Sequence, residues 1–508
     1  EGDDMRRNII RIPLVMGVVL LWTLGIRAEC PATASAQAID LHYYSSAPIY
    51  HSVDIAASTT SQDSYLVVFA PGEPIDSYLT GVAYREYATS NHSLQAYGDI
   101  DSITRTGYRK AARVDNLNFL GILGGWLTGW NAWYQKGDYK DQTMTRSLAS
   151  DLSPINNTLY SFSGILTEVQ DVAALPGMNR GVQVAAGLQD GAYVAPLLLR
   201  YIEMDGSLGD LVPVSGYSSS GWAYPAVASS VVASTAKVVV TWSHTSGLVY
   251  FRVFDANGNP LTPPTFADYG IDSDVAAVPT GFAIAYTTGT GSNRSVKVRT
   301  FDWSGTLRQT AIVSDGPGDY VNPSISGSMY QVGSGDPFPF FGITYTNQFE
   351  SYGVPFIVRY YRLGRGLISP MLWAINPTII HWVYGQSFSP PDRSTEYRNS
   401  VKLFTGCTDR LVAGIVWNQT QGTNLTTYRA FIGVDGNGLM DASSSSAPQG
   451  GSIMPVLPPP GTREMDDGSF VLANPNLTSS IFSIPASGES TEGIPDCYDY
   501  RIGSCVLE

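Results

Sequence analysis

The chain has 508 residues, a hydrophobic fraction of 44% and a net charge of −14, with only 15% charged residues. This hydrophobic fraction excludes a disordered chain. The acidic balance, without any basic cluster, excludes nucleic acid and an anionic membrane surface as partners. The 51 glycines, 31 prolines, 30 tyrosines and 18 phenylalanines predict β-strands joined by turns.

The first 38 residues have the pattern of a secretory signal peptide. Two arginines after Met5 precede an apolar run at 9–26, and small residues follow it. A basic start, an apolar middle and an Ala-x-Ala exit are typical of a cleaved signal. We expect cleavage after Ala36 or Ala38, with an uncleaved membrane anchor as the alternative. The protein is then secreted or at the cell surface, periplasmic in a Gram-negative bacterium, and free of the membrane.

Three kinds of short β-like run recur between residues 39 and 440. The first holds small and β-branched residues, the second is apolar and ends in an aromatic, and the third contains an arginine. The seven arginines are about 57 residues apart on average: Arg85, Arg146, Arg200, Arg252, Arg299, Arg359 and Arg429. Such a unit is too short for an immunoglobulin-like sandwich and too long for one coil of a β-helix.

These units predict an all-β fold, a seven-bladed β-propeller of four-stranded antiparallel blades, with eight blades as the alternative. The small residues suit the crowded axis, and the aromatics suit the space between blades. We expect the arginine on an edge strand, where a charge resists pairing with other chains.

Units four and five, at about 217–315, resemble those of secreted β-propeller repeat proteins. Such units read roughly VVxW and then vRxFDxxGxxL, which residues 249–261 match best. The resemblance implies this fold and no single activity. The chain lacks the Gly-His and Trp-Asp pattern of WD40 repeats and the Ser-x-Asp-x-Gly-x-Thr-Trp box of sialidase-like propellers.

Residues 441–508 are interpreted as a C-terminal tail with loop-rich segments. A strand-like run at 468–473 is expected to complete the first blade and so close the ring, or else to belong to an incomplete eighth blade. Cys497 and Cys505 are eight residues apart and are expected to form a disulfide in an oxidising compartment.

Acidic residues recur where the small-residue strand begins. Aligning the units places Asp54, Asp115, Asp171 and Asp274 in one slot, which Pro225, Pro323 and Ser400 fill elsewhere. If this strand is innermost, the carboxylates surround one mouth of a central channel. They would then accept sugar hydroxyls, hold Ca²⁺ or form a glycosidase acid–base pair. Alternatively they only satisfy nearby backbone N–H groups. We expect no cofactor, with Ca²⁺ as the one ion such a ring would suit.

A second set of candidate binding residues lies in the long connection between Arg359 and Ser400. It consists of Trp373, His381, Trp382 and Tyr384. Long loops on a rigid scaffold often carry binding sites, and aromatic faces stack on sugar rings. We expect this loop on the same face as the acidic slot; the alternative is that it covers a blade edge or seats an extra strand.

The sequence contains no GxSxG, HExxH or P-loop motif. We therefore predict a secreted, non-enzymatic recognition module that binds a glycan or an extracellular protein on one propeller face. The alternative is a carbohydrate-active hydrolase or lyase using the inner-strand carboxylates. A third hypothesis is a structural subunit of an extracellular layer or fibre, suggested by the low charge and the 30 tyrosines.

Overall fold

The structure is a computed structural model, and it describes strands and turns between residues 34 and 433. The described ranges are 34–39, 52–58, 64–70, 82–89, 93–101, 109–119, 123–132, 142–156, 159–162, 166–188, 197–215, 222–244, 246–291, 293–314, 319–330, 338–347, 354–363, 372–374, 378–383, 400–405, 411–421 and 424–433. In these ranges, no helix has the length and apolar character needed to cross a bilayer.

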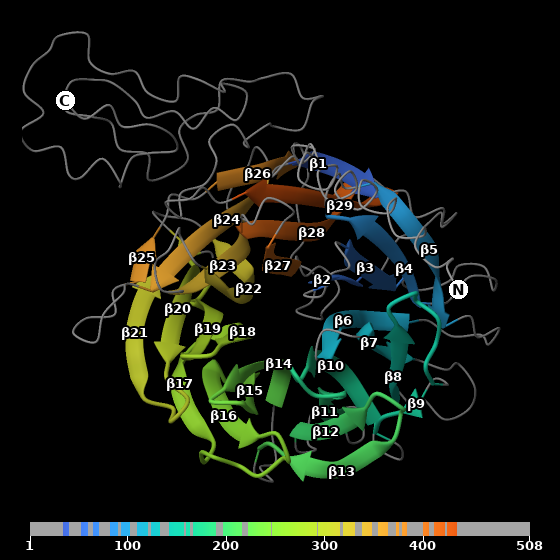
Figure 1. The fold of residues 1–508 in the computed structure, drawn as a ribbon. Helices are drawn as coiled ribbons and strands as arrows, with labels where there is room; N and C mark the ends of the chain where they lie inside the picture. Colours follow the sequence, from blue (N-terminus) through green and yellow to red (C-terminus); the bar gives the residue numbers. More distant parts are fainter. Residues whose placement is uncertain are drawn as a thin grey trace, which may run out of the picture.

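Within these ranges the strands form seven antiparallel sheets (Figure 1). Sheet 1 contains β2 (Ser52–Ala57), β3 (Ser64–Ala70), β4 (Val82–Ala88) and β5 (Leu94–Asp101). Sheet 2 contains β6 (Arg109–Phe119), β7 (Leu123–Ala132), β8 (Gln142–Ala149) and β9 (Leu159–Tyr160). Sheet 3 contains β10 (Leu166–Ala174), β11 (Arg180–Leu188), β12 (Leu197–Glu203) and β13 (Leu208–Pro213).

The other four sheets follow in the same order. Sheet 4 contains β14 (Trp222–Val232), β15 (Thr235–His244), β16 (Leu248–Asp255) and β17 (Thr265–Tyr269). Sheet 5 contains β18 (Ile271–Val278), β19 (Gly281–Thr288), β20 (Ser295–Phe301) and β21 (Leu307–Ile312). Sheet 6 contains β22 (Tyr320–Tyr330), β23 (Phe338–Asn347), β24 (Val354–Leu363), β25 (Leu372–Ala374) and β26 (Thr378–Val383). Sheet 7 contains β27 (Ser400–Thr405), β28 (Leu411–Gln421), β29 (Asn424–Gly433) and β1 (Ala34–Ile39).

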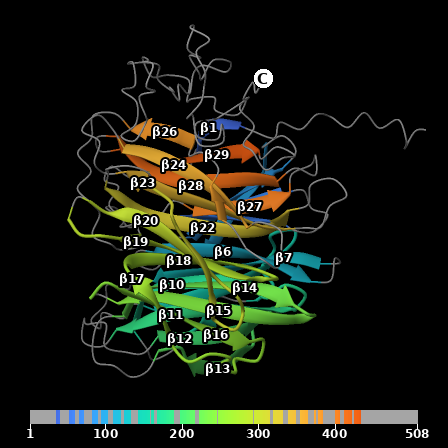
Figure 2. The ribbon, with the colours of Figure 1, turned by 90° about the vertical axis from the view of Figure 1, so that its left-hand side faces the viewer.

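The sheets are arranged radially, with the first strand of each sheet innermost (Figure 1). Each innermost strand packs against those of the two neighbouring sheets, and β27 of sheet 7 packs against β2 of sheet 1. Viewed from the side, the sheets lie one behind another around the axis, and the strands of successive sheets are inclined to one another (Figure 2). The small and β-branched runs predicted for the axis therefore lie at the axis.

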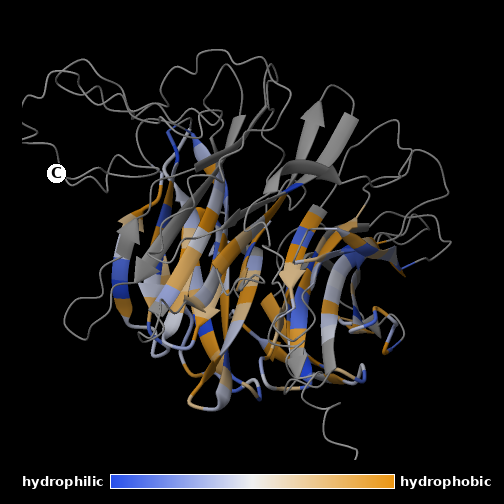
Figure 3. Cartoon of the chain, turned by 45° about the horizontal axis from the view of Figure 1, so that its top comes forward, coloured by the Kyte–Doolittle hydropathy of each residue, from blue (hydrophilic) through white to orange (hydrophobic). Residues whose placement is uncertain are grey.

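The hydrophobic core lies between consecutive sheets. Trp126 and Trp130 of β7 fill the space between sheets 1 and 2, and Trp242 of β15 does the same between sheets 3 and 4; all three are fully buried. Tyr286 lies between sheets 4 and 5, and Tyr345 between sheets 5 and 6. Figure 3 shows hydrophobic segments along the strands, broken by short hydrophilic ones. The aromatic second strands thus fill the spaces between sheets, as predicted from their size.

The recurring arginine does not lie on an edge strand. It sits in the third strand of each sheet, and in all seven sheets a further strand covers that third strand. Arg200 is typical: its Nε donates to the carbonyl of Gly209 at 2.9 Å in its own sheet, and its Nη1 donates to the carbonyl of Ser161 at 2.6 Å, just after the last strand of sheet 2. In sheets 2, 4 and 5 the arginine likewise reaches the preceding sheet, at the carbonyls of Ile100, Val214 and Ala267. These arginines therefore join neighbouring sheets instead of keeping other chains away.

The outer edge of sheet 7 is completed by an N-terminal strand. Strand β1 pairs with β29, with Ala38 opposite Tyr428 and Ile39 opposite Thr427. The sequence pattern suggested that residues 468–473 complete sheet 1, but sheet 1 already has its own fourth strand, β5. Residues 468–473, Cys497 and Cys505 lie outside the described residues. Strand β1 also spans both Ala-x-Ala sites at which cleavage is expected.

Candidate functional site in the central cavity

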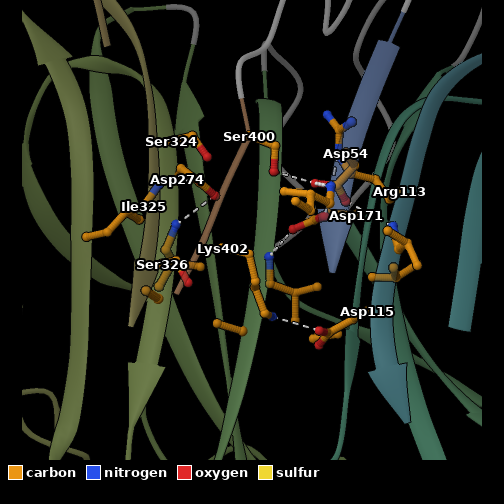
Figure 4. A pocket seen from close by; sticks show the side chains of 18 of the residues that line it. Asp54, Arg113, Asp115, Asp171, Asp274, Ser324, Ile325, Ser326, Ser400 and Lys402 are labelled. Atoms are coloured by element: carbon orange, nitrogen blue, oxygen red, sulfur yellow. Dashed lines mark hydrogen bonds and ion pairs between the residues drawn. The ribbon is translucent and has the colours of Figure 1, made fainter. Parts of the chain in front are cut away.

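The innermost strands of all seven sheets surround one cavity of about 260 Å³ (Figure 4). Its charged lining residues are Asp54, Asp115, Asp171 and Asp274 with Arg113 and Lys402. The structure therefore brings together the four carboxylates that the unit alignment placed in one slot. Two cations that sequence reasoning missed lie among them.

Strand register defines a first layer of cavity residues. In sheet 5, Val275 lies level with Ile284 and with the recurring Arg299, and Asp274 is the residue before it. The same position in sheets 1 to 4 and 6 is read from the arginine of each sheet. In sheet 7 the arginine lies level with Ser400 itself, one residue past this position, and Ser400 is included because its hydroxyl donates to Asp54. The first layer, from sheet 1 to sheet 7, is Asp54, Arg113, Asp171, Ala226, Asp274, Ser324 and Ser400.

Asp115 does not share the slot of the other three aspartates. Arg113 occupies that slot in sheet 2, and Asp115 lies two residues further along the strand. The alignment by sequence failed here because the number of residues between the innermost strand and the arginine differs from unit to unit. Pro225 and Pro323 are each one residue short of the slot, which Ala226 and Ser324 occupy.

Bulges aim the first-layer side chains. In sheets 5 and 6 the bulge contains a residue with left-handed backbone, Asp272 with φ 51° and Asn322 with φ 53°, two positions before Asp274 and Ser324. Asp and Asn tolerate this conformation better than other non-glycine residues, and a bulge re-aims the side chains beside it. An Asp or Asn two residues before the small-residue strand is a signal that sequence analysis missed.

Each aspartate joins its sheet to the next one. Asp54 accepts a hydrogen bond at Oδ2 from the backbone N–H of Val114 at 2.9 Å, and Asp171 accepts one from Val227 at 2.8 Å. Asp274 accepts from Ile325 at 2.9 Å, and Asp115 accepts from Ala174 at 2.9 Å. The four carboxylates therefore tie inner strands together, which is the backbone-satisfying role considered from the sequence. The second oxygen atom of each carboxylate has different contacts.

The second oxygens divide the aspartates into paired and unpaired ones. Asp171 Oδ1 lies 3.6 Å from Nε of Arg113, and Asp115 Oδ1 accepts a hydrogen bond from Nζ of Lys402 at 2.8 Å. Asp54 Oδ1 accepts from its neighbour's N–H and from the hydroxyl of Ser400 at 2.5 Å. Asp274 Oδ1 accepts only the N–H of Val275, at 2.9 Å. Within the described residues, Asp274 has no cation in contact.

The Lys402–Asp115 ion pair joins two sheets that are not neighbours. Lys402 belongs to β27 of sheet 7 and Asp115 to β6 of sheet 2, so the lysine reaches across β2 of sheet 1. This one ion pair therefore joins the last sheet to the second.

Burial changes the acidity of these groups. Burial raises the pKa of Asp171 to about 7; the charge of Arg113 opposes this, and those of Asp274 and Asp54 add to it. Burial also raises the pKa of Asp54, although Arg113 and the bond from Ser400 counteract it. Burial acts to lower the pKa of Lys402, but attraction to Asp115 and the other carboxylates outweighs it and raises that pKa. Near neutral pH, Asp171 thus exchanges a proton while Lys402 stays charged.

The aromatic candidates are not beside the carboxylates. The backbone around Trp373 forms β25, and that around His381 and Trp382 forms β26; both strands pair with β24 at the outer edge of sheet 6. The expectation of a loop beside the acidic slot is therefore wrong for these three residues, because their β-branched and aromatic neighbours extend the sheet. Tyr384 lies outside the described residues. A binding role for all four stays a prediction.

Among the described residues, no group of three or more His, Cys, Asp or Glu side chains has the arrangement of a metal site. Asp54 and Asp274 each accept backbone N–H donors from two strands, and Asp171 accepts one from Val227. Binding of Ca²⁺ in this layer stays a prediction.

No family model and no curated protein sequence matches the chain. Among solved structures, a mutant of the NanB sialidase from Streptococcus pneumoniae is 11% identical with a TM-score of 0.41, over 79% of this chain and 71% of that one. The α-L-arabinanase of Penicillium chrysogenum complexed with arabinobiose is 9% identical with a TM-score of 0.43, over 79% and 99%. The BP39L lectin from Burkholderia pseudomallei is 11% identical with a TM-score of 0.43, over 74% and 98%. Similarity this low carries no argument about activity.

Proposed function

We propose that this protein is a secreted or cell-surface, seven-bladed β-propeller that recognises a glycan in its central cavity without cleaving it. The observation that carries the proposal is the first layer: Asp54, Asp171 and Asp274 line one cavity together with the hydroxyls of Ser324 and Ser400. Carboxylates accept hydrogen bonds from sugar hydroxyls, and serine hydroxyls both donate and accept them. The basic and apolar pattern of residues 5–38 supports export.

The size of the cavity favours a sugar over a protein partner. A volume of about 260 Å³ at the axis admits one or two sugar-sized groups and no protein surface. Ligand sites of this kind are concave and fix orientation through a few convergent polar groups. We therefore expect the end of a glycan chain to enter and the rest of the glycan to leave through one mouth.

The hydrogen bonds of the carboxylates favour binding over hydrolysis. Asp54 accepts bonds from three donors, Ile55, Val114 and Ser400. These donors counteract the rise in the pKa of Asp54 that burial causes, and they fix the orientation of the carboxylate. A carboxylate held in one orientation by three donors suits recognition of a hydroxyl more than attack on a substrate.

One observation favours the second candidate, a carbohydrate-active hydrolase or lyase. Burial and two nearby carboxylates raise the pKa of Asp171 to about 7, so it carries a proton near neutral pH while a neighbour such as Asp274 would act as the base. This division of roles between two carboxyls is how glycosidases assign acid and base. An activity assay therefore belongs in the same experiment as the binding assay.

The test is a glycan array with the purified protein, followed by a reducing-end assay on every glycan that binds. The double variant Asp171→Asn and Asp274→Asn should abolish binding, because in each side chain it removes the negative charge and replaces one acceptor oxygen by an NH2 donor. Asp205→Asn is the matched control, since this exposed carboxylate accepts bonds only from Ser207 in an outer turn. Release of reducing ends by the wild type would establish the second candidate instead. Silence on all glycans would refute both.

A further inference from the structure

The first layer is electrically uneven around the cavity. Arg113 lies between Asp54 on one side and Asp171 on the other, in sheets 1, 2 and 3. Asp274 lies in sheet 5, and its neighbours in the layer are the uncharged Ala226 and Ser324. One side therefore has a guanidinium shared by two carboxylates, and the other has a carboxylate alone.

Ser324 is a second feature of the side near Asp274. It lines the cavity, is only 7% exposed, and lies beside Asp274 in Figure 4. Its hydroxyl has no hydrogen-bond partner among the described residues. The residue is buried but its hydroxyl is open to the cavity, so this hydroxyl is a place where a ligand atom can bond.

Ser326, two residues after Ser324 on the same strand, has a hydrogen-bond partner, which Ser324 lacks among the described residues. Ser326 Oγ accepts the backbone N–H of Leu403 at 3.0 Å, which ties sheet 6 to sheet 7. Ser326 thus has the structural role that Ser324 lacks, although both line the cavity on the same strand. The contrast makes Ser326 a matched control for Ser324.

We propose that Asp274 and Ser324 form a subsite for a protonated amino group, so that the glycan recognised is one ending in an amino sugar. This rests on the proposed function. The cavity lining holds four carboxylates, one guanidinium and one ammonium, a formal charge of −2 that becomes −1 when Asp171 is protonated, and the ammonium is already paired with Asp115. A ligand ammonium donates one hydrogen bond to Asp274 and another to Ser324, and it offsets the excess negative charge. A neutral sugar satisfies only the hydrogen bonds, and a uronic acid is repelled.

The test measures binding of simple sugars to the full chain by isothermal titration calorimetry. Glucosamine, galactosamine and mannosamine are each compared with the parent hexose and with the uronic acid of that hexose. We expect the best amino sugar to bind about tenfold more tightly than its hexose, because hydrogen bonds to a charged group are the stronger ones. The uronic acid should bind most weakly. The preference should shrink as salt is added, because ions screen the attraction.

Three variants locate the subsite. Asp274→Asn should remove the preference for the amine, and Ser324→Ala should weaken binding of amino sugar and hexose alike. Ser326→Ala should lower the free energy of unfolding and leave both affinities unchanged. Equal or tighter binding of the hexose or uronic acid by the wild type overturns the subsite while leaving the proposed function standing. Salt-independent preference, or preference retained in Asp274→Asn, also overturns it. Failure of every sugar and every arrayed glycan to bind refutes the proposed function itself.

Discussion

Replacing Asp171 by Asn is predicted to change how stability depends on pH. Burial raises the pKa of Asp171 to about 7 from its usual 3.8. Between these values the folded protein keeps a proton that the unfolded chain has lost. The folded state then binds more protons, so the free energy of unfolding falls as pH rises through this window. The contribution is complete below pH 3.8 and is lost by the time pH exceeds about 7.

The magnitude follows from the part of this window that an experiment can reach. One pKa unit corresponds to about 1.4 kcal/mol. Between pH 5 and pH 8, only the two pH units below the pKa of about 7 contribute. Over this range the wild type therefore loses about 2.5 kcal/mol of its free energy of unfolding through Asp171. The side chain is 15% exposed, so screening by solvent removes little of this. The Asn variant keeps an acceptor for the N–H of Val227 but has no proton to lose.

The assay is urea unfolding at pH 5 and pH 8, followed by tryptophan fluorescence. Relative to the wild type, Asp171→Asn should gain about 2.5 kcal/mol between the two pH values. Asp151→Asn is the control, because bonds from Ser153 lower the pKa of this exposed carboxyl and keep it ionised throughout. Wild type and Asp171→Asn changing in parallel with pH would refute the claim that this carboxyl is protonated when folded.

Three further predictions concern the scaffold. Arg200→Lys should cost about 1–3 kcal/mol in urea unfolding, because one ammonium cannot bond both Gly209 and Ser161; unchanged stability would contradict the bridging role. Gly258→Ala should cost more than Gly177→Ala, since both have positive φ but only at Gly258 would a Cβ approach Val212 and Tyr201; equal thermal midpoints would contradict this. Removal of residues 34–38, which cleavage after Ala38 would also bring about, should leave the ring intact but expose the edge of β29, seen as association in light scattering; a monodisperse truncated protein would argue that β1 does not protect this edge.

The strands were predictable from the sequence because each one carries a local pattern. The run ending at Trp242, for example, combines β-branched residues with an aromatic, and it forms the fully buried middle of β15. Patterns of this kind depend on the residues of one strand alone. The gathering of Asp54, Asp171 and Asp274 was predictable for the same reason, since equivalent positions in repeated units share a place in the fold.

The features of the site that the sequence did not predict depend on pairing between strands. Arg113 shares a layer with Asp171 through the register of β6 against β7, and counting residues between strands does not reveal that register. Lys402 meets Asp115 across 287 residues and an intervening sheet, which no comparison of repeats would suggest. The aromatic residues of β25 and β26 were misplaced because length alone did not distinguish a loop from an added edge strand.

Strand β1 has a consequence for how the protein folds. Its residue Ala34 pairs with Phe431, so one of the first described segments must find one of the last. Contacts this distant in sequence form late and slowly, because the whole intervening chain must be organised before they are favourable. During synthesis from the N-terminus, the outer edge of sheet 7 cannot be covered until β29 exists. The ring would thus be joined last of all, at a seam where both ends of the described chain meet.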